Sequence, residues 1–429
     1  MYRKIMSYLE FWKESVHRKP LILQGARQVG KTWSILEFGR THYDNVAYFN
    51  FETNPKLNDT FAENISPDYL IPILSHIAGQ TIVKEKTLIV FDEVQLCERA
   101  LTSLKYFCED APEYHVIVAG SLLGVAVNRA KFSFPVGKVD MKTLYPMDVE
   151  EFMLAMGEGA LVERIKECFR TDTPMPSALH DAAMQLYRQY LVVGGMPECV
   201  MQFVQTRDYI LVRHTQDTIL ASYLNDMSKY NNLNEIKKTR LAYDNITVQL
   251  SKRNTRFQYK LIKKGGRASE FENAIEWLCL SGIVSQVYRQ IKKPLENYRD
   301  IDAFKIYVSD LGLLCAKKNL AANDVLYMVE ELNDFKGGMA ENYVHVQLTI
   351  NGYSTYYWES DRGAEVDFVI QREGQLIPIE VKSADNTRAK SLKVYMDTYK
   401  PAYAIKLSTK NFGFEDGKKT VPLYAAFCI

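Results

Sequence analysis

The stretch GARQVGKT, residues 25–32, restricts the possible folds more than any other part of the sequence. An apolar run, PLIL, precedes it, and a helix-like pattern, WSILEFGR, follows it. A G-x-x-x-x-G-K-T stretch between a strand and a helix is typical of a loop whose backbone N–H groups surround phosphate oxygens. We therefore predict an α/β domain in which this P-loop follows one strand of a parallel sheet.

Each part of the P-loop has an expected role in binding ATP. The Lys31 ammonium supplies positive charge to the outer phosphates, and the Thr32 hydroxyl can bind Mg²⁺. A chance match in a glycine-containing loop is the alternative, and the strand–loop–helix context argues against it. The predicted nucleotide-binding residues are Gly25, Ala26, Arg27, Gln28, Val29, Gly30, Lys31, Thr32 and Trp33.

A second motif supports ATP hydrolysis. The apolar run at residues 88–91 predicts a buried parallel strand, and Asp92 and Glu93 follow it directly. Asp92 at this strand end can hold Mg²⁺ through water, and Glu93 is placed to polarise the water that attacks the γ-phosphate. An Asp-Glu pair alone is equally a helix cap, but a P-loop upstream favours paired Walker A and Walker B elements.

Two further strands are predicted at residues 45–52 and 115–121. Ligand groups gather at the C-terminal ends of strands in an open parallel sheet. Asn50 and Ser121, near these strand ends, are therefore candidates to face the γ-phosphate. Either residue can equally cap its strand.

Residues 138–153 predict a fifth strand followed by a helix that starts after Pro146, with Asp148 near its first turn. Beyond them, residues 155–225 contain long helix-like patterns. A helical lid behind the nucleotide is their simplest role.

Length and composition set the broad class of the protein. A chain of 429 residues predicts several domains, and its 47% hydrophobic and 24% charged fractions are typical of soluble globular proteins. The seven cysteines include no CxxC pair, which argues against a zinc site and a disulfide framework. No apolar run is long enough to span a bilayer, so we expect a cytoplasmic protein with no membrane partner.

A basic segment begins at residue 250, although the net charge of the whole chain is only +1. Helices followed by a basic β-wing are the pattern of a winged-helix module, and clustered cations would neutralise DNA phosphates without reading the sequence. A solvated charged face is the alternative. The predicted DNA-binding residues are Lys252, Arg253, Arg256, Lys260, Lys263, Lys264 and Arg267.

Residues 364–383 predict a β-hairpin around Glu373-Gly374. Strict alternation places residues 366, 368 and 370 on one side, and the register sets Asp367 opposite Glu380 and residue 365 opposite Lys382. Opposed carboxylates repel, so either a bound cation or an exposed surface pair explains them. A bulge at Pro378 would change this register.

Several motifs together resemble the AAA-type ATPases that carry a C-terminal DUF4143 domain. They are GARQVGKTW, NFE, LIVFDEVQ, VAGSLLG and LYPMDVEEF, followed by YLVVGGMPECV, FENAIEWLCLSGIV, FKIYVSDLGLL and KGGMAENYV, so the resemblance covers nearly the whole chain. It implies an AAA/ASCE P-loop core at 1–155, a helical lid at 156–225, a winged-helix-like module at 226–330 and a nuclease-like domain at 331–429.

The C-terminal residues follow the E…D…E-x-K order of PD-(D/E)xK nucleases, a restriction-endonuclease-like α/β fold that the family's last domain resembles. In that interpretation Asp367 and Glu380 hold Mg²⁺, Glu341 steadies the site, and Lys382 orients or activates the water. A scaffold that only binds DNA or a partner is the alternative.

The chain departs from the family at Gly137-Lys138, where the family usually has Gly-Arg. An arginine there is a candidate finger onto a neighbouring copy's nucleotide, and lysine cannot make the same bidentate contact. Arg129 is a substitute candidate within a possible homo-oligomer.

The predicted function is therefore an Mg²⁺-dependent ATPase that acts on or with DNA. One alternative is an ATP-dependent regulatory or assembly switch whose C-terminal domain is a non-catalytic binding module. Another is a DNA nuclease that ATP licenses.

Overall fold

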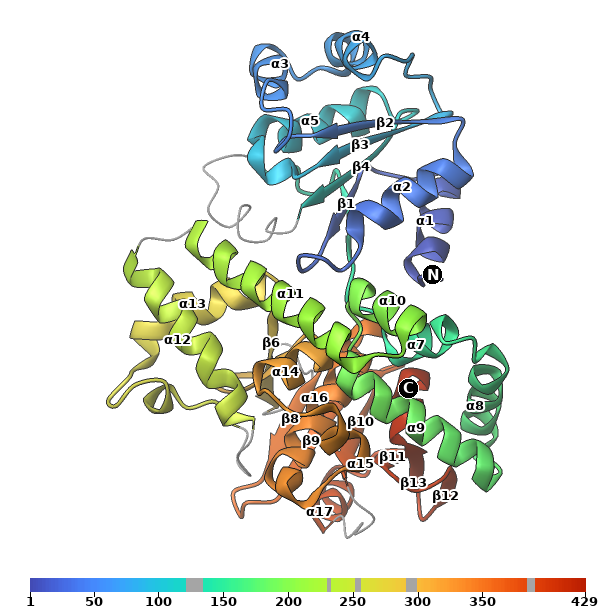
Figure 1. Ribbon diagram of the computed structural model, residues 1–429, viewed down its shortest axis with the longest axis vertical. Coiled ribbons are helices and arrows are strands. Elements are labelled where there is room, and N and C mark those ends of the chain that lie inside the picture. Colours follow the sequence, from blue (N-terminus) through green and yellow to red (C-terminus); the bar gives the residue numbers. More distant parts are fainter. Residues whose placement is uncertain (121–133, 230–232, 251–255, 291–298, 384–389) are drawn as a thin grey trace. The chain divides into compact units, whose positions relative to one another are not determined.

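The computed structural model describes residues 1–429 except 121–133, 230–232, 251–255, 291–298 and 384–389. The chain forms two compact units (Figure 1). The smaller unit contains Tyr2–Tyr145 and Leu280–Gly282, and the larger contains Pro146–Cys279 and Ile283–Ile429 together with Met1.

A parallel sheet forms the centre of the smaller unit, as the sequence predicts. Its strand order is β2-β3-β4-β1-β5, and every neighbouring pair is parallel. Both β3 and β4 are buried along their whole length, which explains their continuous apolar sequences. The strands are β1 (Leu21–Gln24), β2 (Asn45–Asn50), β3 (Thr87–Asp92), β4 (His115–Gly120) and β5 (Asp140–Thr143).

Helices pack around this sheet, and one hydrophobic core contains a group of phenylalanines. Phe91 of β3 contacts the rings of Phe51, Phe61 and Phe107, mostly edge to face. This packing holds β3 in place, so the residues at its C-terminal end have a fixed position. The helices are α1 (Ile5–Glu14), α2 (Lys31–His42), α3 (Leu57–Glu63), α4 (Pro67–Ala78) and α5 (Glu98–Asp110).

The larger unit begins with helices, as predicted for residues 155–225. Asp148 caps the first of them through a capping box with Glu151, which confirms the expected helix start after Pro146. The helices up to the second sheet are α7 (Val149–Ala155), α8 (Gly159–Thr171), α9 (Ser177–Val193), α10 (Pro197–Thr206), α11 (Tyr209–Lys229), α12 (Leu233–Gln249) and α13 (Ala268–Leu280).

An eight-stranded sheet with the order β12-β13-β11-β10-β9-β8-β6-β7 forms the rest of the larger unit. Its strands are β6 (Val284–Gln290), β7 (Arg299–Val308), β8 (Tyr356–Glu359), β9 (Glu365–Arg372), β10 (Gln375–Val381), β11 (Ala404–Ser408), β12 (Gly413–Glu415) and β13 (Lys418–Pro422). The accompanying helices are α14 (Leu311–Lys317), α15 (Ala322–Tyr327), α16 (Asn333–Ile350) and α17 (Lys390–Tyr399).

The predicted wing corresponds to β6 and β7, which pair in antiparallel fashion after α12 and α13. Strand β6 also pairs with β8 in parallel, so this hairpin continues the sheet of the C-terminal region. Helices and a hairpin in the expected order are therefore present. A separate winged-helix module stays a prediction, as does a restriction-endonuclease-like fold for the residues that follow.

Candidate functional site

The P-loop connects β1 to α2, as the sequence predicts. Gly30 precedes the helix with φ 91°, a left-handed conformation that glycine adopts without strain. A Cβ on Gly25 would lie 2.1 Å from the carbonyl oxygen of Leu144, so only glycine fits there. The loop backbone therefore reaches the N-terminus of α2 in the tight form that an anion-binding loop needs.

Lys31 lies at the start of α2 and is only 8% exposed. Its Nζ donates hydrogen bonds to the carbonyl oxygens of Gly25 and Ala26, at 2.9 and 2.7 Å. Burial lowers the pKa of Lys31 to about 8, although the nearby carboxylates of Glu93 and Asp92 oppose this shift. The ammonium is thus held inside the loop by backbone oxygens and acidic neighbours.

Asp92, at the end of β3, accepts two hydroxyl hydrogen bonds on one oxygen. Thr32 Oγ1 donates to Asp92 Oδ2 at 2.9 Å, and the Tyr48 hydroxyl donates to the same oxygen at 2.7 Å. The hydroxyl and carboxylate oxygens predicted to bind Mg²⁺ therefore meet, because β1 and β3 end at the same edge of the sheet. No motif in the sequence distinguishes Tyr48 from the other residues of the predicted strand at 45–52.

Glu93 follows Asp92 in a left-handed conformation with φ 51°, which is strained for a residue with a side chain. Gln95 Nε2 donates a hydrogen bond to Glu93 Oε2. Burial raises the pKa of Glu93, and the hydrogen bond from Gln95 opposes that rise. The carboxylate predicted to polarise water is thus held by Gln95, a residue that no motif in the sequence marks.

The C-terminal hairpin has the predicted turn and register. Glu373 and Gly374 both have positive φ, 50° and 77°, and Arg372 pairs with Gln375. The pairing continues without a shift through Pro378, so the bulge considered there is absent from β9 and β10. Beyond this ladder, Asp367 Oδ2 accepts a hydrogen bond from the backbone N–H of Val381 at 2.7 Å.

A bulge lies instead between β8 and β9. Tyr356 pairs with Val369 and Trp358 with Val366, so β9 contains an extra residue in this interval. Val366 and Val369 belong to one hydrophobic cluster, whereas the Phe368 ring lies beside the rings of Tyr307 and His345. The predicted alternation, with residues 366 and 368 on one side, is wrong for this reason.

Both carboxylates are buried, so the alternative of an exposed surface pair is wrong. Asp367 is 9% exposed and Glu380 is 4% exposed. Burial, followed by the charges of Glu341 and Glu380, raises the pKa of Asp367 well above its usual value. Burial also raises the pKa of Glu380, although the charge of Lys382 opposes that shift.

Lys382 forms an ion pair with Glu380, at 2.5 Å between Nζ and Oε1. The ladder of β9 and β10 ends at Phe368 and Ile379, so the predicted placement of residue 365 opposite Lys382 stays a prediction. Glu365 forms its ion pair with Lys305 of β7. The structure therefore brings the predicted residues Glu341, Asp367, Glu380 and Lys382 together and adds Lys305. Within the described parts of the chain, no group of three or more His, Cys, Asp or Glu side chains is arranged to hold a metal ion.

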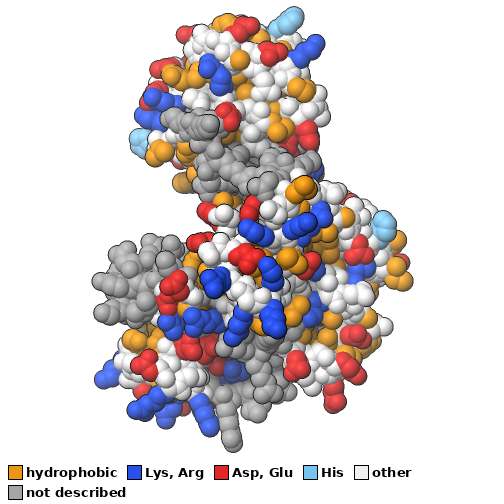
Figure 2. All heavy atoms as spheres, turned by 90° about the vertical axis from the view of Figure 1, so that its left-hand side faces the viewer, with side chains coloured by type: hydrophobic (Ala, Val, Ile, Leu, Met, Phe, Trp, Pro, Cys, Tyr) orange, Lys and Arg blue, Asp and Glu red, His pale blue; other side chains and the backbone are white. Residues whose placement is uncertain are grey.

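The described Lys and Arg side chains of the predicted DNA-binding stretch are exposed, and Lys252 and Arg253 lie outside the described residues. Figure 2 shows several groups of Lys and Arg side chains on this side of the larger unit, with acidic side chains among them. Phe257, which lies between Arg256 and Lys260 in the sequence, is buried against Phe304, with ring centroids 5.5 Å apart, so it is a core residue. The exposed cations are Arg256, Lys260, Lys263, Lys264 and Arg267.

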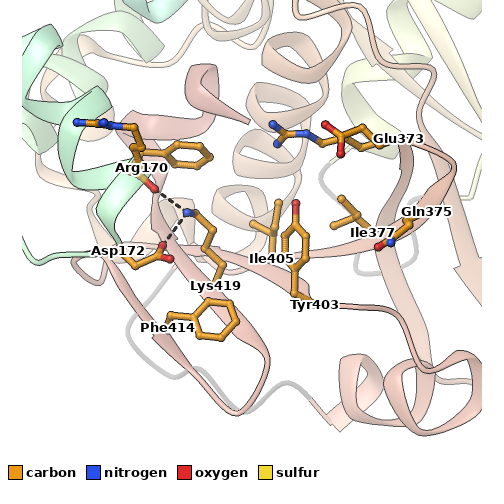
Figure 3. A pocket seen from close by; sticks show the side chains of 11 residues that line it. Arg170, Asp172, Glu373, Gln375, Ile377, Tyr403, Ile405, Phe414 and Lys419 are labelled. Atoms are coloured by element: carbon orange, nitrogen blue, oxygen red, sulfur yellow. Dashed lines mark hydrogen bonds and ion pairs between the residues drawn. The ribbon is translucent and has the colours of Figure 1, made fainter.

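A cavity of about 590 Å³ in the larger unit is lined by none of the predicted site residues (Figure 3). Lys419 points at Asp172 and bonds to it and to the Phe169 carbonyl, each at 2.6 Å. Because the lysine is already paired, the cavity offers a mixed surface without a clear charge preference. Its lining residues are Phe169, Arg170, Asp172, Arg372, Glu373, Gln375, Ile377, Tyr403, Ile405, Phe414 and Lys419.

Comparison with known families agrees with the geometry of the P-loop. Residues 17–153, which include the P-loop and the end of β3, match a family described as an AAA domain. This part of the chain is an AAA domain. Residues 184–324 match a domain of unknown function, DUF8612, and residues 336–426 match another, DUF4143. The predicted AAA and DUF4143 domains are therefore confirmed.

No curated protein matches the sequence. Among solved structures, the Aeropyrum pernix ORC2 protein in its ADPNP-ADP complexes is 13% identical, with a TM-score of 0.36 over 79% of this chain and 94% of that one. The Thermotoga maritima RuvB Holliday junction branch migration motor is 15% identical, with a TM-score of 0.30 over 66% and 87%. Cdc6p from Pyrobaculum aerophilum is 12% identical, with a TM-score of 0.26 over 76% and 93%.

Arg3 supports the P-loop of the AAA domain from a distant part of the sequence. Its guanidinium donates to the carbonyl oxygens of Val29 and Tyr145, at 2.9 and 2.8 Å, and the residue is 3% exposed. It therefore ties the loop to the segment after β5. No local signal marks Arg3, because its partners are far away along the chain.

Asn50 acts as a cap in this structure of the AAA domain. Its Oδ1 accepts hydrogen bonds from the backbone N–H groups of Glu52 and Thr53, both at 2.9 Å, and its Nδ2 donates to the Tyr48 hydroxyl. Of the two roles considered, the structure shows the cap. Ser121, the second such candidate, lies outside the described residues.

Lys138 forms an ion pair with Glu109 of α5, at 2.8 Å. Both side chains belong to the AAA domain, so the lysine has a partner within its own chain. A role toward a neighbouring copy stays a prediction, and Arg129 lies outside the described residues. None of the helices in the described part of the chain is long and apolar enough to cross a membrane.

Proposed function

We propose that the AAA domain binds ATP together with Mg²⁺ and hydrolyses the γ-phosphate bond. The observation that carries this proposal is the 2.9 Å hydrogen bond between Thr32 Oγ1 and Asp92 Oδ2. It brings a hydroxyl and a carboxylate, both hard oxygen ligands, to the end of the P-loop. The family match of residues 17–153 supports the same assignment.

The residues present fit a nucleotide and its metal ion. Gly25 leaves no space for a Cβ beside Leu144, and the loop leads directly into the N-terminus of α2, where backbone N–H groups favour phosphate oxygens. Thr32 and Asp92 would hold Mg²⁺, which when bound neutralises charge on the phosphates. Lys31 would contact the outer phosphates, and Glu93 would accept a proton from the attacking water.

Two substitutions separate binding from hydrolysis. Lys31→Ala removes the cation of the P-loop and should weaken binding of a fluorescent ATP analogue at least about tenfold. Glu93→Gln keeps the shape of the side chain and removes its basicity, so binding should persist while phosphate release falls about 10²- to 10⁴-fold. Lys86→Ala, at an exposed lysine of the same domain, is the control. Equal turnover in Glu93→Gln and the wild type would contradict the role given to Glu93.

We also propose that the basic stretch of the larger unit contacts nucleic acid. The specific support is that its five described cations are exposed, and that no acidic residue occurs between residues 250 and 269. Such a surface binds phosphates largely independently of sequence. The acidic side chains nearby, such as Glu270 paired with Lys263 at 3.1 Å, limit how many phosphates it neutralises.

The salt dependence of DNA binding tests this proposal. Replacing Arg256, Lys260 and Lys264 with Ala should weaken binding across unrelated sequences and flatten the slope of log affinity against log salt. Replacing Lys84 and Lys86, exposed lysines of the AAA domain, should leave the slope unchanged. An unaltered slope in the triple variant would place any DNA surface elsewhere.

DNA-stimulated ATP turnover distinguishes the proposed function from an assembly switch. An ATPase that acts on DNA should hydrolyse ATP faster when DNA is added, and the triple variant should lose that increase. A switch that controls protein assembly should show the same turnover with and without DNA.

A further inference from the structure

Four carboxylates and two lysines lie close together in the larger unit, where Asp367, Glu380 and Lys305 are buried and the others are partly exposed. We call the carboxylates of Glu341, Glu365, Asp367 and Glu380 the acidic cluster. They come from α16, β9 and β10. In the described part of the chain, Lys382 forms an ion pair with one of them, Glu380. Unpaired carboxylates in a protein interior are strongly unfavourable, so the acidic cluster needs further positive charge.

Lys305 of β7 supplies this charge. The residue is 1% exposed, its Nζ is bonded to Glu365 Oε1, and it lies 3.5 Å from Glu341 Oε2. The same nitrogen lies 5.2 Å from the centre of the Tyr357 ring, a contact that also favours a cation. Residues of α16, β8 and β9 together therefore fix the position of the Lys305 ammonium.

A neighbouring tyrosine completes the surroundings of the ammonium. The Tyr307 hydroxyl, on the same strand as Lys305, donates to Glu341 Oε2 at 3.0 Å. That oxygen is thus shared between a hydroxyl hydrogen and the ammonium. Glu341, the residue expected to steady a metal site, is occupied by β7 side chains instead.

We propose that Lys305 is the resident cation of the acidic cluster, so that the cluster binds no divalent metal and the C-terminal domain works without metal-dependent phosphodiester cleavage. A divalent ion between Asp367 and Glu341 would lie a few ångströms from a buried ammonium, where charge repulsion is large because water is excluded. The absence of a metal-ready group among the described acidic side chains agrees with this. The inference does not depend on the proposed ATPase activity.

The positive charge of Lys305 comes from outside the segment that contains the nuclease-like motif. Lys305 belongs to residues 184–324, whereas the acidic cluster lies within 336–426. The two segments share one sheet through the pairing of β6 with β8. An acidic motif read from residues 336–426 alone therefore includes Lys382 but lacks the second cation, Lys305.

Thermal unfolding with Mn²⁺ or with EDTA tests the proposal in the full-length chain. Thr32→Ala combined with Asp92→Asn serves as the parent, because these changes remove the other expected cation ligands. The parent should melt at the same temperature in Mn²⁺ and EDTA. Lys305→Met in this parent should melt about 10 °C lower in EDTA, because it leaves buried carboxylates unpaired, and Mn²⁺ should restore part of the loss.

Two further variants serve as controls. Lys317→Met removes a lysine whose Nζ lies 2.6 Å from Asp244 and 3.9 Å from the centre of the Tyr243 ring, outside the acidic cluster, and should create no response to Mn²⁺. Lys305→Arg keeps the charge and should also remain unresponsive.

A parent that Mn²⁺ stabilises, with the stabilisation abolished by Asp367→Asn, would overturn the proposal, since a metal would then bind despite Lys305. Equal melting of Lys305→Met and its parent in EDTA would overturn it as well. If Lys305→Met does not fold, the melting temperature of the parent in Mn²⁺ and in EDTA still tests whether the acidic cluster binds a metal ion. Cutting of a DNA duplex by the wild-type chain that requires Mg²⁺ and is lost in Asp367→Asn would also be contrary evidence.

Discussion

Two opposing influences act on the Glu93 carboxyl group. Burial disfavours its charge, while the hydrogen bond from Gln95 stabilises the ionised form. Its backbone is also strained at φ 51°, which fixes the direction in which the side chain leaves β3. Gln95 therefore influences both the position and the ionisation of the residue that we expect to activate water.

Gln95→Met tests this influence. Loss of the hydrogen bond should raise the pKa of Glu93 further, so the acidic limb of the pH profile of kcat should move upward by about 1 to 2 pH units. A steady-state phosphate-release assay between pH 4.5 and 8 measures the shift. Gln80→Met, which removes a side-chain hydrogen bond to the Val46 carbonyl in the same domain, is the control. An unmoved acidic limb would mean that Gln95 does not affect the ionisation that limits turnover.

The roles of single residues in local motifs were predictable from the sequence. Contacts between residues far apart along the chain were not. The roles of Lys31, Thr32 and Asp92 follow from short patterns that also determine the strand, loop and helix around them. Arg3 and Lys305 meet their partners only after the strands have paired, since Arg3 bonds to Val29 and Lys305 to Glu365. A single sequence contains no local sign of either contact.

The junction around Gly195, which joins α9 to α10, shows how closely elements of the larger unit approach one another. The Met147 N–H donates to the Gly195 carbonyl at 2.7 Å, and the Gly195 N–H donates to Asp310 Oδ2 at 2.6 Å. Asp310 also caps α14 by accepting from the Leu313 N–H. One glycine thus links the segment before α7 to the start of α14.

Gly195→Ala should destabilise the larger unit strongly. Its Cβ would lie 1.9 Å from the Met147 carbonyl oxygen, a backbone atom that cannot move without breaking the junction. We expect a loss of about 3 kcal/mol or more in the free energy of unfolding, measured by urea denaturation. Gly337→Ala, where nothing lies within 4 Å of the new Cβ, should be neutral or slightly stabilising. Equal effects of both variants would contradict this account.

The order and type of the elements were largely predictable from hydrophobic patterns and turn residues, including the hairpin around Gly374. The bulge between β8 and β9 was not, because a bulge depends on how Tyr356 and Trp358 pair with a partner strand. It changes which side Val366 faces. An alternating sequence does not reveal such an insertion.

Each compact unit of the whole molecule contains a buried neutral histidine. Burial lowers the pKa of His115 to about 4 in the smaller unit and that of His345 to about 3 in the larger. The Tyr43 hydroxyl hydrogen-bonds with His115 at 2.7 Å, and Thr355 hydrogen-bonds with His345 at 3.0 Å. Between the normal pKa near 6.5 and these lower values, the unfolded chain binds protons that the folded chain does not.

Protonation of each histidine should therefore cost its own unit stability as the pH falls below about 6.5. His345 alone should account for about 2 kcal/mol lost between pH 7 and pH 5, and His345→Gln should remove that part of the pH dependence. Hydrogen exchange followed separately in the two units measures the effect, and His115→Asn should act only on the smaller one. The exposed His17, changed to Gln, is the control. A pH dependence that is unchanged in His345→Gln would show that this histidine is not the source.

The parallel pairing of β6 with β8 has a consequence for truncated forms of the protein. A chain that started at residue 336 would keep β8 to β13 but lack β6 and β7, leaving the N–H and C=O groups along one side of β8 exposed. Exposed strand edges pair with other chains, so such a fragment should self-associate or aggregate. Proteolysis between residues 309 and 336 of the folded protein should instead leave the two pieces bound to each other through the intact sheet.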